Sequence, residues 1–290
     1  MGSQPSPRLI TSSLAAPQQP LSSGDDEVAC SATKERAAKE RTDALRHFDA
    51  AFSEGPAVSA EDLKEAFRLR YLVYCLDRGF EDAGSCPSGL EYDDYDSQAS
   101  HCLLRDRCGK RALGTVRVVM TTGADTGVDS LPLAEYASEE SMEILRSLPG
   151  ASTAEVSRFA ITRSARDILR HSAKTAEDRF GTPGDTLRRF EKLLPYMALG
   201  LFRGIIRLSI RREVSHWCLA AEPSLLRRLR GLGLHFEPAG PLVEHRGLRQ
   251  ICYAEVTELL ARVEAERPEI WDVMTLGGLL LSDEPARTVA

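Results

Sequence analysis

Four carboxylates stand close together in the segment LEYDDYD, residues 90–96: Glu91, Asp93, Asp94 and Asp96. Like charges at this spacing repel one another and raise each other's pKa, so a protein that keeps them together must compensate or use them. Three interpretations are open: a metal site, a solvated turn, and a pocket for a cationic or amine-bearing substrate. Metal is the least favoured, because the calcium-loop pattern D-x-[DN]-x-[DN]-G-x5-E is absent, and we predict no metal site.

Charged side chains also occur inside segments that otherwise look like core. Arg70 lies in the apolar run RLRYLVYC, Arg117 stands between valines in GTVRVV, and Glu155 and Arg158 lie in AEVSRF. Burying an unpaired guanidinium is costly, so Arg70 either has a carboxylate partner or reaches solvent at the edge of its helix. Buried arginines and glutamates in a sheet either pair for structure or line a cleft, and the residues alone leave both options open.

Two arginine motifs need separate treatment. The pattern R-x-x-G-x-G at 228–233 has the spacing with which many acetyl-coenzyme A enzymes hold pyrophosphate, but its glycines close an expected helix instead of opening one. We therefore do not expect a nucleotide there. Arg203, Arg207 and Arg211 recur every four residues on another expected helix, as a solvated face or as a docking strip for an acidic partner or a phosphopantetheine phosphate. Gly200 and Gly204 of the same helix should permit close packing.

Covalent catalysis is not expected, because the chain has no GxSxG motif and no cysteine that the sequence can pair with a histidine. Lysine and arginine total 37 against 43 aspartates and glutamates, so the net charge of −6 gives no reason to expect a nucleic-acid partner. The seven scattered cysteines form no CxxC pair, which suits reduced thiols in the cytoplasm.

Membrane insertion is not expected either. The first residues show no apolar core of signal-peptide length. The longest apolar stretch, 193–210, is interrupted by Arg203 and Arg207 and is shorter than the roughly 20 apolar residues that a bilayer requires. We therefore predict no integral membrane segment and a cytoplasmic location, with peripheral membrane contact left as an alternative.

The segments that must position these residues follow from composition and periodicity. Residues 1–31 are rich in Ser, Pro and Gln and are expected to be a disordered tail, while residues 32–270 form one domain with an insertion at about 163–186 and a C-terminal extension at 271–290. A helix is expected within 32–52, then a short strand PAVSA and a second helix that begins at a capping box of Ser59 and Asp62.

The sheet follows from the remaining segments. HCLLRD and RALGTVRVVM predict a hairpin with its turn at 108–110, and the strand 154–162 should place Glu155, Ser157 and Phe159 on one face and Val156, Arg158 and Ala160 on the other. Further elements are expected at 195–212 (helix), 214–221 (strand) and 222–230 (helix), followed by two strands and a helix near 255–266. This order predicts an α/β (α+β) fold with a mostly antiparallel central sheet, one parallel strand pair and flanking helices.

Taken in order, the motifs resemble those of a known group of enzymes. Arg70, E-x-D-x-x-D at 91–96, G-x-x-R at 114–117 and E-x-x-R-F at 155–159 resemble the acyl-homoserine-lactone (autoinducer) synthases and the N-acyl amino acid synthases. The resemblance is closer to the PEP-CTERM/exosortase system-associated acyltransferases over about residues 47–255, through HFDAAF, AFRLRYLVYCLDRGFE, EVSRFAI, ALGLFRGIIRLS, EPSLLRRLRGLGLHFEPAGP and VEHRGLR.

This resemblance implies a GNAT-like acyl-CoA N-acyltransferase fold. It implies an enzyme that moves an acyl group from an acyl carrier protein, or from acyl-CoA, to a small primary amine or amino acid, with no tightly bound cofactor. The implied roles are these: Glu155 and Arg158 catalytic, Phe159, Arg203 and Arg207 at the acyl donor, and Arg70, Glu91, Asp93, Asp96 and Arg117 at the acceptor. The three carboxylates would bind the amine directly or order the first helix through Arg70, and Glu155 would assist deprotonation of the amine.

The sequence also departs from the autoinducer synthases. Their tryptophan after the first helix has no counterpart in DRGFE, where Phe80 is the nearest aromatic residue. An amino acid or another amine is therefore expected as acceptor in preference to S-adenosylmethionine. The absence of a well-placed pyrophosphate loop favours acyl carrier protein as donor. Alternatives are an autoinducer synthase, a catalytically silent acyl-binding regulator, and a protein acetyltransferase that uses acetyl-coenzyme A.

Overall fold

The computed structural model describes residues 45–107, 110–122, 127–167 and 196–282, except 47 and 166. All described residues belong to one compact unit of the chain. Several predicted features lie outside this part of the chain. They are the tail at 1–31, the start of the helix expected within 32–52, the turn residues Cys108 and Gly109, most of the insertion at 163–186 and the last residues from 283.

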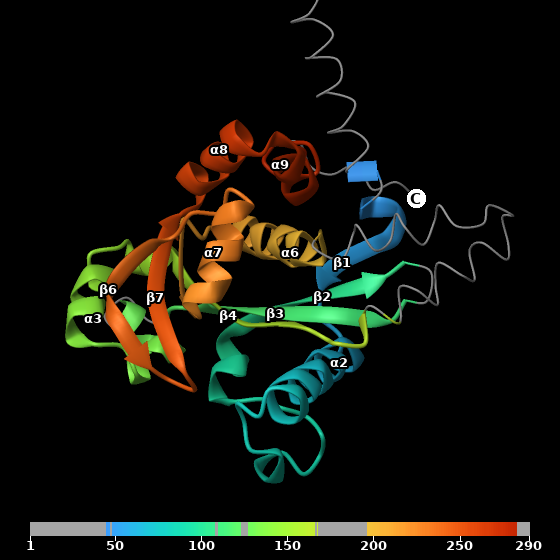
Figure 1. Cartoon of the computed structure of the whole chain (residues 1–290), viewed down its shortest axis with the longest axis horizontal. Coiled ribbons are helices and arrows are strands. Elements are labelled where there is room, and N and C mark those ends of the chain that lie inside the picture. The colour runs from blue at the N-terminus through green and yellow to red at the C-terminus, as the bar shows by residue number, and fades with distance from the viewer. Residues whose placement is uncertain are drawn as a thin grey trace, which may run out of the picture. The chain divides into compact units, whose positions relative to one another are not determined.

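The centre of the fold is a seven-stranded sheet with the order β1-β2-β3-β4-β5-β7-β6 (Figure 1). Its strands are β1 Phe52–Pro56, β2 Ala99–Asp106, β3 Ala112–Met120, β4 Thr153–Ile161, β5 His216–Ala221, β6 Glu237–Glu244 and β7 Leu248–Glu255. Strands β4 and β5 are parallel, and the other neighbouring pairs are antiparallel. The predicted hairpin, the mostly antiparallel sheet and its parallel pair are thus confirmed.

Helices cover both faces of this sheet. They are α2 Ala60–Arg70, which continues as a π-helix at Tyr71–Asp77, α3 Glu139–Arg146, α6 Met197–Arg211, α7 Pro223–Gly231, α8 Val256–Glu266 and α9 Pro268–Thr275. Figure 1 shows α2 and α6 on opposite sides of β2 and β3. None of the described helices is long and apolar enough to cross a bilayer.

The start of α2 follows from its cap. The backbone N–H of Asp62 donates to the Ser59 hydroxyl at 3.1 Å, as the predicted capping motif requires. The strand expected at PAVSA, residues 56–60, lies earlier in the chain: β1 ends at Pro56, which pairs with Cys102 of β2. Pairing with β2 determines this strand, whereas Ser59 leaves the sheet because it serves as the helix cap.

Helix α6 packs closely on the sheet through its two glycines. A Cβ atom at Gly200 would lie 2.6 Å from a Leu104 methyl carbon, and one at Gly204 would lie 2.2 Å from the sulfur of Cys102. Real Cβ contacts are never this short, so only glycine allows the helix to approach β2. The close packing expected of these glycines is confirmed.

Gly204→Ala is expected to lower the free energy of unfolding by about 2 kcal/mol, because overpacking a filled core forces neighbours to shift. Gly231→Ala is the matched control: the same exchange in α7, where nothing lies within 4 Å of the added Cβ. The control should be neutral or gain up to about 1 kcal/mol from helix propensity. Urea unfolding of the two variants checks this, and equal stabilities would contradict the packing argument.

Strand β4 does not keep the predicted alternation. Arg158 has a φ of 51°, and the register with β3 shifts between Thr115 and Arg117. This β-bulge turns Arg158 toward the carboxylates that Arg117 also contacts, while Phe159 lies against Phe202 of α6, with ring centroids 5.5 Å apart. The expectation that Phe159 shares a face with Glu155, and Arg158 the opposite one, is therefore wrong.

Candidate active site

Arg70 ends α2 and is completely buried, where it meets the acidic segment. Its Nε atom donates to Glu91 at 2.5 Å and its Nη1 atom donates to Asp96 at 2.6 Å. A buried guanidinium is tolerated only when such partners compensate it. Of the two options that the sequence left open for Arg70, a carboxylate partner or contact with solvent, the first is therefore confirmed.

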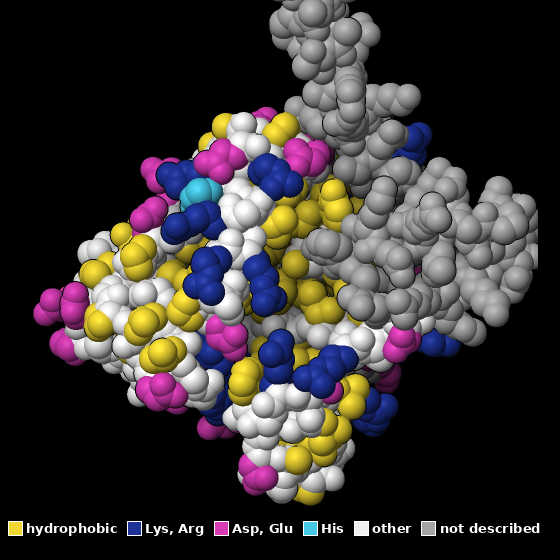
Figure 2. Space-filling model, in the orientation of Figure 1, with side chains coloured by type: hydrophobic (Ala, Val, Ile, Leu, Met, Phe, Trp, Pro, Cys, Tyr) yellow, Lys and Arg dark blue, Asp and Glu magenta, His cyan; other side chains and the backbone are white. Residues whose placement is uncertain are grey.

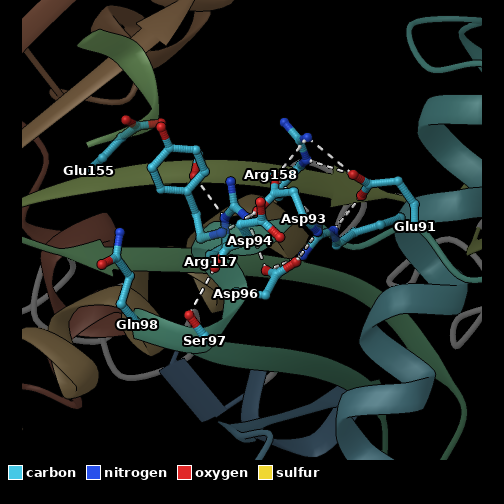
Figure 3. Close-up of polar contacts among 12 residues, drawn as sticks. Glu91, Asp93, Asp94, Asp96, Ser97, Gln98, Arg117, Glu155 and Arg158 are labelled. Carbon is cyan, nitrogen blue, oxygen red and sulfur yellow. Dashed lines mark hydrogen bonds and ion pairs between the residues drawn. The ribbon is translucent and has the colours of Figure 1, made fainter. Parts of the chain in front are cut away.

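Two further arginines complete this network (Figure 3). Arg117 Nη1 contacts Asp93 at 2.5 Å and Asp96 at 2.9 Å. Arg158 Nη2 lies 3.1 Å from oxygens of both Glu91 and Asp93. We call the six residues Arg70, Glu91, Asp93, Asp96, Arg117 and Arg158 the ion-pair network. It joins α2, the 90–96 segment, β3 and β4, and it leaves none of its three carboxylates without an arginine.

The network lowers the pKa of its carboxylates. Burial by itself would raise the pKa of Asp96, but the hydrogen bond and charge of Arg70, together with the charge of Arg117, bring it down to about 2. The arginines also hold the pKa of Glu91 below its usual value, against the opposite effect of burial. Asp96 further accepts the backbone N–H of Asp93 at 2.7 Å in a capping box that shapes the acidic segment.

Glu155 stands apart from this network. It is 2% exposed, accepts the backbone N–H of Leu133 at 2.7 Å, and in Figure 3 no dashed line joins it to the arginines. Burial raises its pKa to about 7, since the hydrogen bond from Leu133 and the more distant charges of Arg117 and Arg158 offset the burial only in part. A carboxyl with this pKa can take and return a proton near neutral pH.

A cavity of about 940 Å³ opens beside Glu155. The pairing of β4 with β5 ends at Glu155 and Cys218, and residues from both strands beyond this point line the cavity. Its apolar wall comes from β4, β5, α6 and α7: Phe159, Ile161, Phe202, Leu219, Leu225 and Leu229. The cavity thus has an apolar slot on one side and the ionisable groups on the other.

The turn between β6 and β7 forms another wall, and sequence patterns did not reveal it. His245 stacks on Tyr136, with ring centroids 3.8 Å apart, and Arg246 pairs with Glu81. Glu81 also contacts Arg158 at 3.1 Å, so a single carboxylate connects the turn to the ion-pair network. Only its place in the DRGFE segment marks Glu81 in the sequence, and nothing there points to a partner 165 residues away along the chain.

The arginine stripe of α6 is not what the sequence suggested. Arg203 is 2% exposed; it donates to the Val273 carbonyl and to Asp49, each at 2.6 Å. Arg207 donates to Glu54 at 2.8 Å, and neither arginine lines the cavity. The prediction that Arg203 belongs to an exposed stripe is therefore wrong. The structure does not support binding of the acyl donor by Arg203 or Arg207.

Other arginines occupy the rim of the cavity. Arg228, within the R-x-x-G-x-G pattern, lines it from an exposed position on α7. Figure 2 shows lysine and arginine side chains around a hollow lined with hydrophobic side chains on this face. The glycines of the pattern end α7 at Gly231, as predicted, so the helix offers them its carbonyl end and no free amides.

Comparison with known proteins agrees with this description. Residues 69–170 match the sequence profile of the acetyltransferase (GNAT) domain. No curated protein matches the sequence significantly. Among solved structures, FeeM, an N-acyl amino acid synthase from uncultured soil microbes, shares 15% identity, with 73% of this chain and 94% of that chain covered and a TM-score of 0.46.

Two acyl-homoserine-lactone synthases are similar to the same degree. BjaI, a coenzyme A-dependent synthase solved with S-adenosylmethionine and isopentyl-CoA, shares 17% identity over 78% of this chain and 99% of that chain, with a TM-score of 0.48. LasI shares 18% identity over 70% and 87%, with a TM-score of 0.44. The chain thus contains a segment, residues 69–170, that matches the acetyltransferase (GNAT) domain and includes strands β2, β3 and β4 of the sheet.

Proposed function

We propose that this protein is an N-acyltransferase that moves a fatty acyl group from a thioester to the amine of an amino acid or a similar small acceptor. The observation that carries the proposal is the position of Glu155. Its carboxyl group is buried, has a pKa raised to about 7, and lies where the sheet splits beside an apolar slot. A base and an acyl-binding surface thus meet at one point.

The acyl chain would lie along the apolar wall. Phe159 and Ile161 from β4, Leu219 from β5 and Leu225 and Leu229 from α7 offer a continuous hydrocarbon surface. Burying each methylene of a fatty chain there contributes roughly 0.8 kcal/mol. A long acyl group therefore suits this slot better than an acetyl group, which opposes the alternative of an acetyl-coenzyme A-dependent protein acetyltransferase.

Deprotonation of the acceptor falls to Glu155. An ordinary carboxylate is a poor base for an ammonium, but raising the pKa from 4.5 to about 7 removes about 3 kcal/mol of that uphill transfer. The neutral amine then attacks the thioester carbon, the C–S bond breaks, and the departing sulfur takes the proton that Glu155 accepted. The second proton that the nitrogen sheds as the amide forms passes to the regenerated Glu155 carboxylate and from there to solvent. No covalent enzyme intermediate is needed.

The ion-pair network shapes the acceptor side of the cavity. Because Arg70 and Arg117 satisfy the carboxylates of the acidic motif, we assign Glu91, Asp93 and Asp96 to ordering this wall instead of contacting the amine. Arg158 remains 18% exposed at the cavity and supplies positive charge beside the reacting carbonyl.

The donor is proposed to be acyl carrier protein, or acyl-CoA, used as a substrate with no cofactor kept in the site. The exposed Arg228 stands where a phosphopantetheine phosphate would enter the slot. The location in the cytoplasm and the association with a PEP-CTERM/exosortase system are also proposals, and the latter rests on the resemblance of the motifs.

Mass spectrometry tests the proposal. The purified protein is incubated with long-chain acyl carrier protein or acyl-CoA, each with pooled amino acids and S-adenosylmethionine. We expect an N-acyl amino acid, and none from Glu155→Gln. An acyl-homoserine lactone would identify an autoinducer synthase instead. Intact thioester in every mixture with a folded protein would contradict the proposal and favour an acyl-binding regulator.

A further inference from the structure

We propose that the acceptor's primary ammonium binds between Glu155 and the pair Glu135–Tyr95, and not on the carboxylates of the LEYDDYD segment. This inference rests on the proposed function, since it names the site at which that reaction holds its amine. Glu135 lies in none of the sequence motifs, Tyr95 stands between the carboxylates of LEYDDYD without having been assigned a role, and both line the cavity.

The charge inventory of the cavity leads to this site. Of the carboxylates that line it, Asp77, Glu81, Glu91, Asp93 and Glu222 each have an arginine within ion-pair distance. Asp82 instead accepts the backbone N–H of Gly84 and the hydroxyl of Ser85. Among the described residues that line the cavity, Asp94, Glu135 and Glu155 likewise have no arginine within ion-pair distance; Glu155 accepts the backbone N–H of Leu133 and Glu135 accepts the Tyr95 hydroxyl.

One short loop ties Glu135 to Glu155. The 3-10 helix Pro132–Glu135 gives Glu155 its hydrogen bond from Leu133 and carries Glu135 two residues later. The Tyr95 hydroxyl donates to Glu135 at 2.6 Å. The hydrogen bond to Glu135 and burial raise the pKa of Tyr95 to about 12, and the charges of Glu135 and Glu155 act in the same direction. Asp94 and Glu135 are both exposed, but Asp94 has no comparable side-chain contact to this group among the described residues.

The chemistry of the three groups fits a primary ammonium. Such a group has three N–H donors, and the site offers three acceptors: the Glu155 carboxylate, the Glu135 carboxylate and the oxygen of Tyr95. Glu155 is a buried carboxylate that makes no ion pair with a described residue, since Arg117 and Arg158 act on it only from a distance, and a bound cation would supply such a pair. The stacked rings of Tyr136 and His245 form the adjoining wall. Amines that lack N–H groups would leave these acceptors unsatisfied.

The kinetic test uses the acceptor that the mass spectrometry identifies. Glu135→Gln is expected to raise the acceptor KM about 10- to 100-fold, as for loss of a charged hydrogen bond, and Tyr95→Phe about 5-fold. The kcat and the thioester KM should change less than about threefold. Glu140→Gln, an exposed glutamate on α3 outside the cavity, is the matched control and should behave as the parent.

Two kinetic outcomes would overturn the assignment. One is a parental acceptor KM in Glu135→Gln. The other is a raised acceptor KM in Asp94→Asn with none in Glu135→Gln, which would move the ammonium to the acidic segment. An equal rise in the thioester KM would show a general distortion of the cavity and would also count against the assignment.

A binding measurement separates this inference from the proposed function. Saturation-transfer NMR with n-butylammonium chloride should show binding to the parent and to Glu140→Gln, and a signal at least about fivefold weaker with Glu135→Gln. Tetramethylammonium, which has no N–H group, should give no signal above that of a denatured sample. No n-butylammonium signal from the folded parent would overturn the site, whether or not acyl transfer is found.

Discussion

Arg70→Ala is expected to lower the free energy of unfolding by about 3–5 kcal/mol, the cost of removing one partner from a buried ion pair. Arg70 has no exposed surface, and its loss would leave Glu91 and Asp96 with less compensation inside the protein. Such a loss is a large share of a typical domain's stability, which is about 5–15 kcal/mol. Denaturant unfolding followed by circular dichroism measures it.

Arg68→Ala is the matched control, because Arg68 lies one half-turn earlier on the same helix with its side chain exposed. Its loss should change stability by less than about 0.5 kcal/mol. Similar losses in the two variants would show that α2 depends on arginine helix propensity and not on the ion-pair network.

Arg70→Ala should also change how the stability of the protein depends on pH in the acid range. The pKa of Asp96 is depressed to about 2 in the folded protein, so its contribution to stability is present above 3.8 and is lost as pH falls toward 2. Without Arg70 the folded and unfolded pKa values approach each other. The stability difference between the parent and Arg70→Ala should therefore shrink as pH falls from about 5 toward 2, which denaturant unfolding at each pH measures.

Glu155→Gln is expected to lower kcat by about 10²- to 10⁴-fold, the usual contribution of a general base. Glutamine can still accept the N–H of Leu133, so the local structure should persist. The parent's rate should rise with pH through about 7, where Glu155 loses its proton, and this limb should be missing from the residual activity of the variant. Initial rates between pH 5 and 9 measure both effects.

As pH rises through about 7, the free energy of unfolding should fall while the activity rises. Because the folded-state pKa of Glu155 is raised from 4.5 to about 7, the folded protein binds a proton over this window that the unfolded chain has released. Ionisation thus costs the fold about 3 kcal/mol as pH rises through the window. Glu155→Gln removes this loss and should be more stable than the parent at pH 8. A variant that is inactive because it is unfolded would contradict the assignment.

Much of the fold could be predicted from local patterns. Alternating apolar residues predicted the β2–β3 hairpin, a hydroxyl before Asp62 predicted the start of α2, and the two glycines of α6 predicted its close packing. These features depend on residues that are near in sequence or on one periodic face. The start and end of β1 were missed, because they depend on pairing with β2, about 45 residues later.

For the site, the sequence by itself determined that Arg70, Arg117, Arg158 and Glu155 lie in core-like segments, where each charge must either pair, reach solvent or line a cleft. It could not determine which carboxylate would stay free. Only the tertiary structure decided that: the bulge at Arg158 and the approach of α2 to β3 bring arginines onto Glu91, Asp93 and Asp96. In the same way, contacts with Asp49 and Val273 bury Arg203. Charge pairing depends on distances of a few ångströms between segments far apart in the chain, and sequence spacing does not contain those distances.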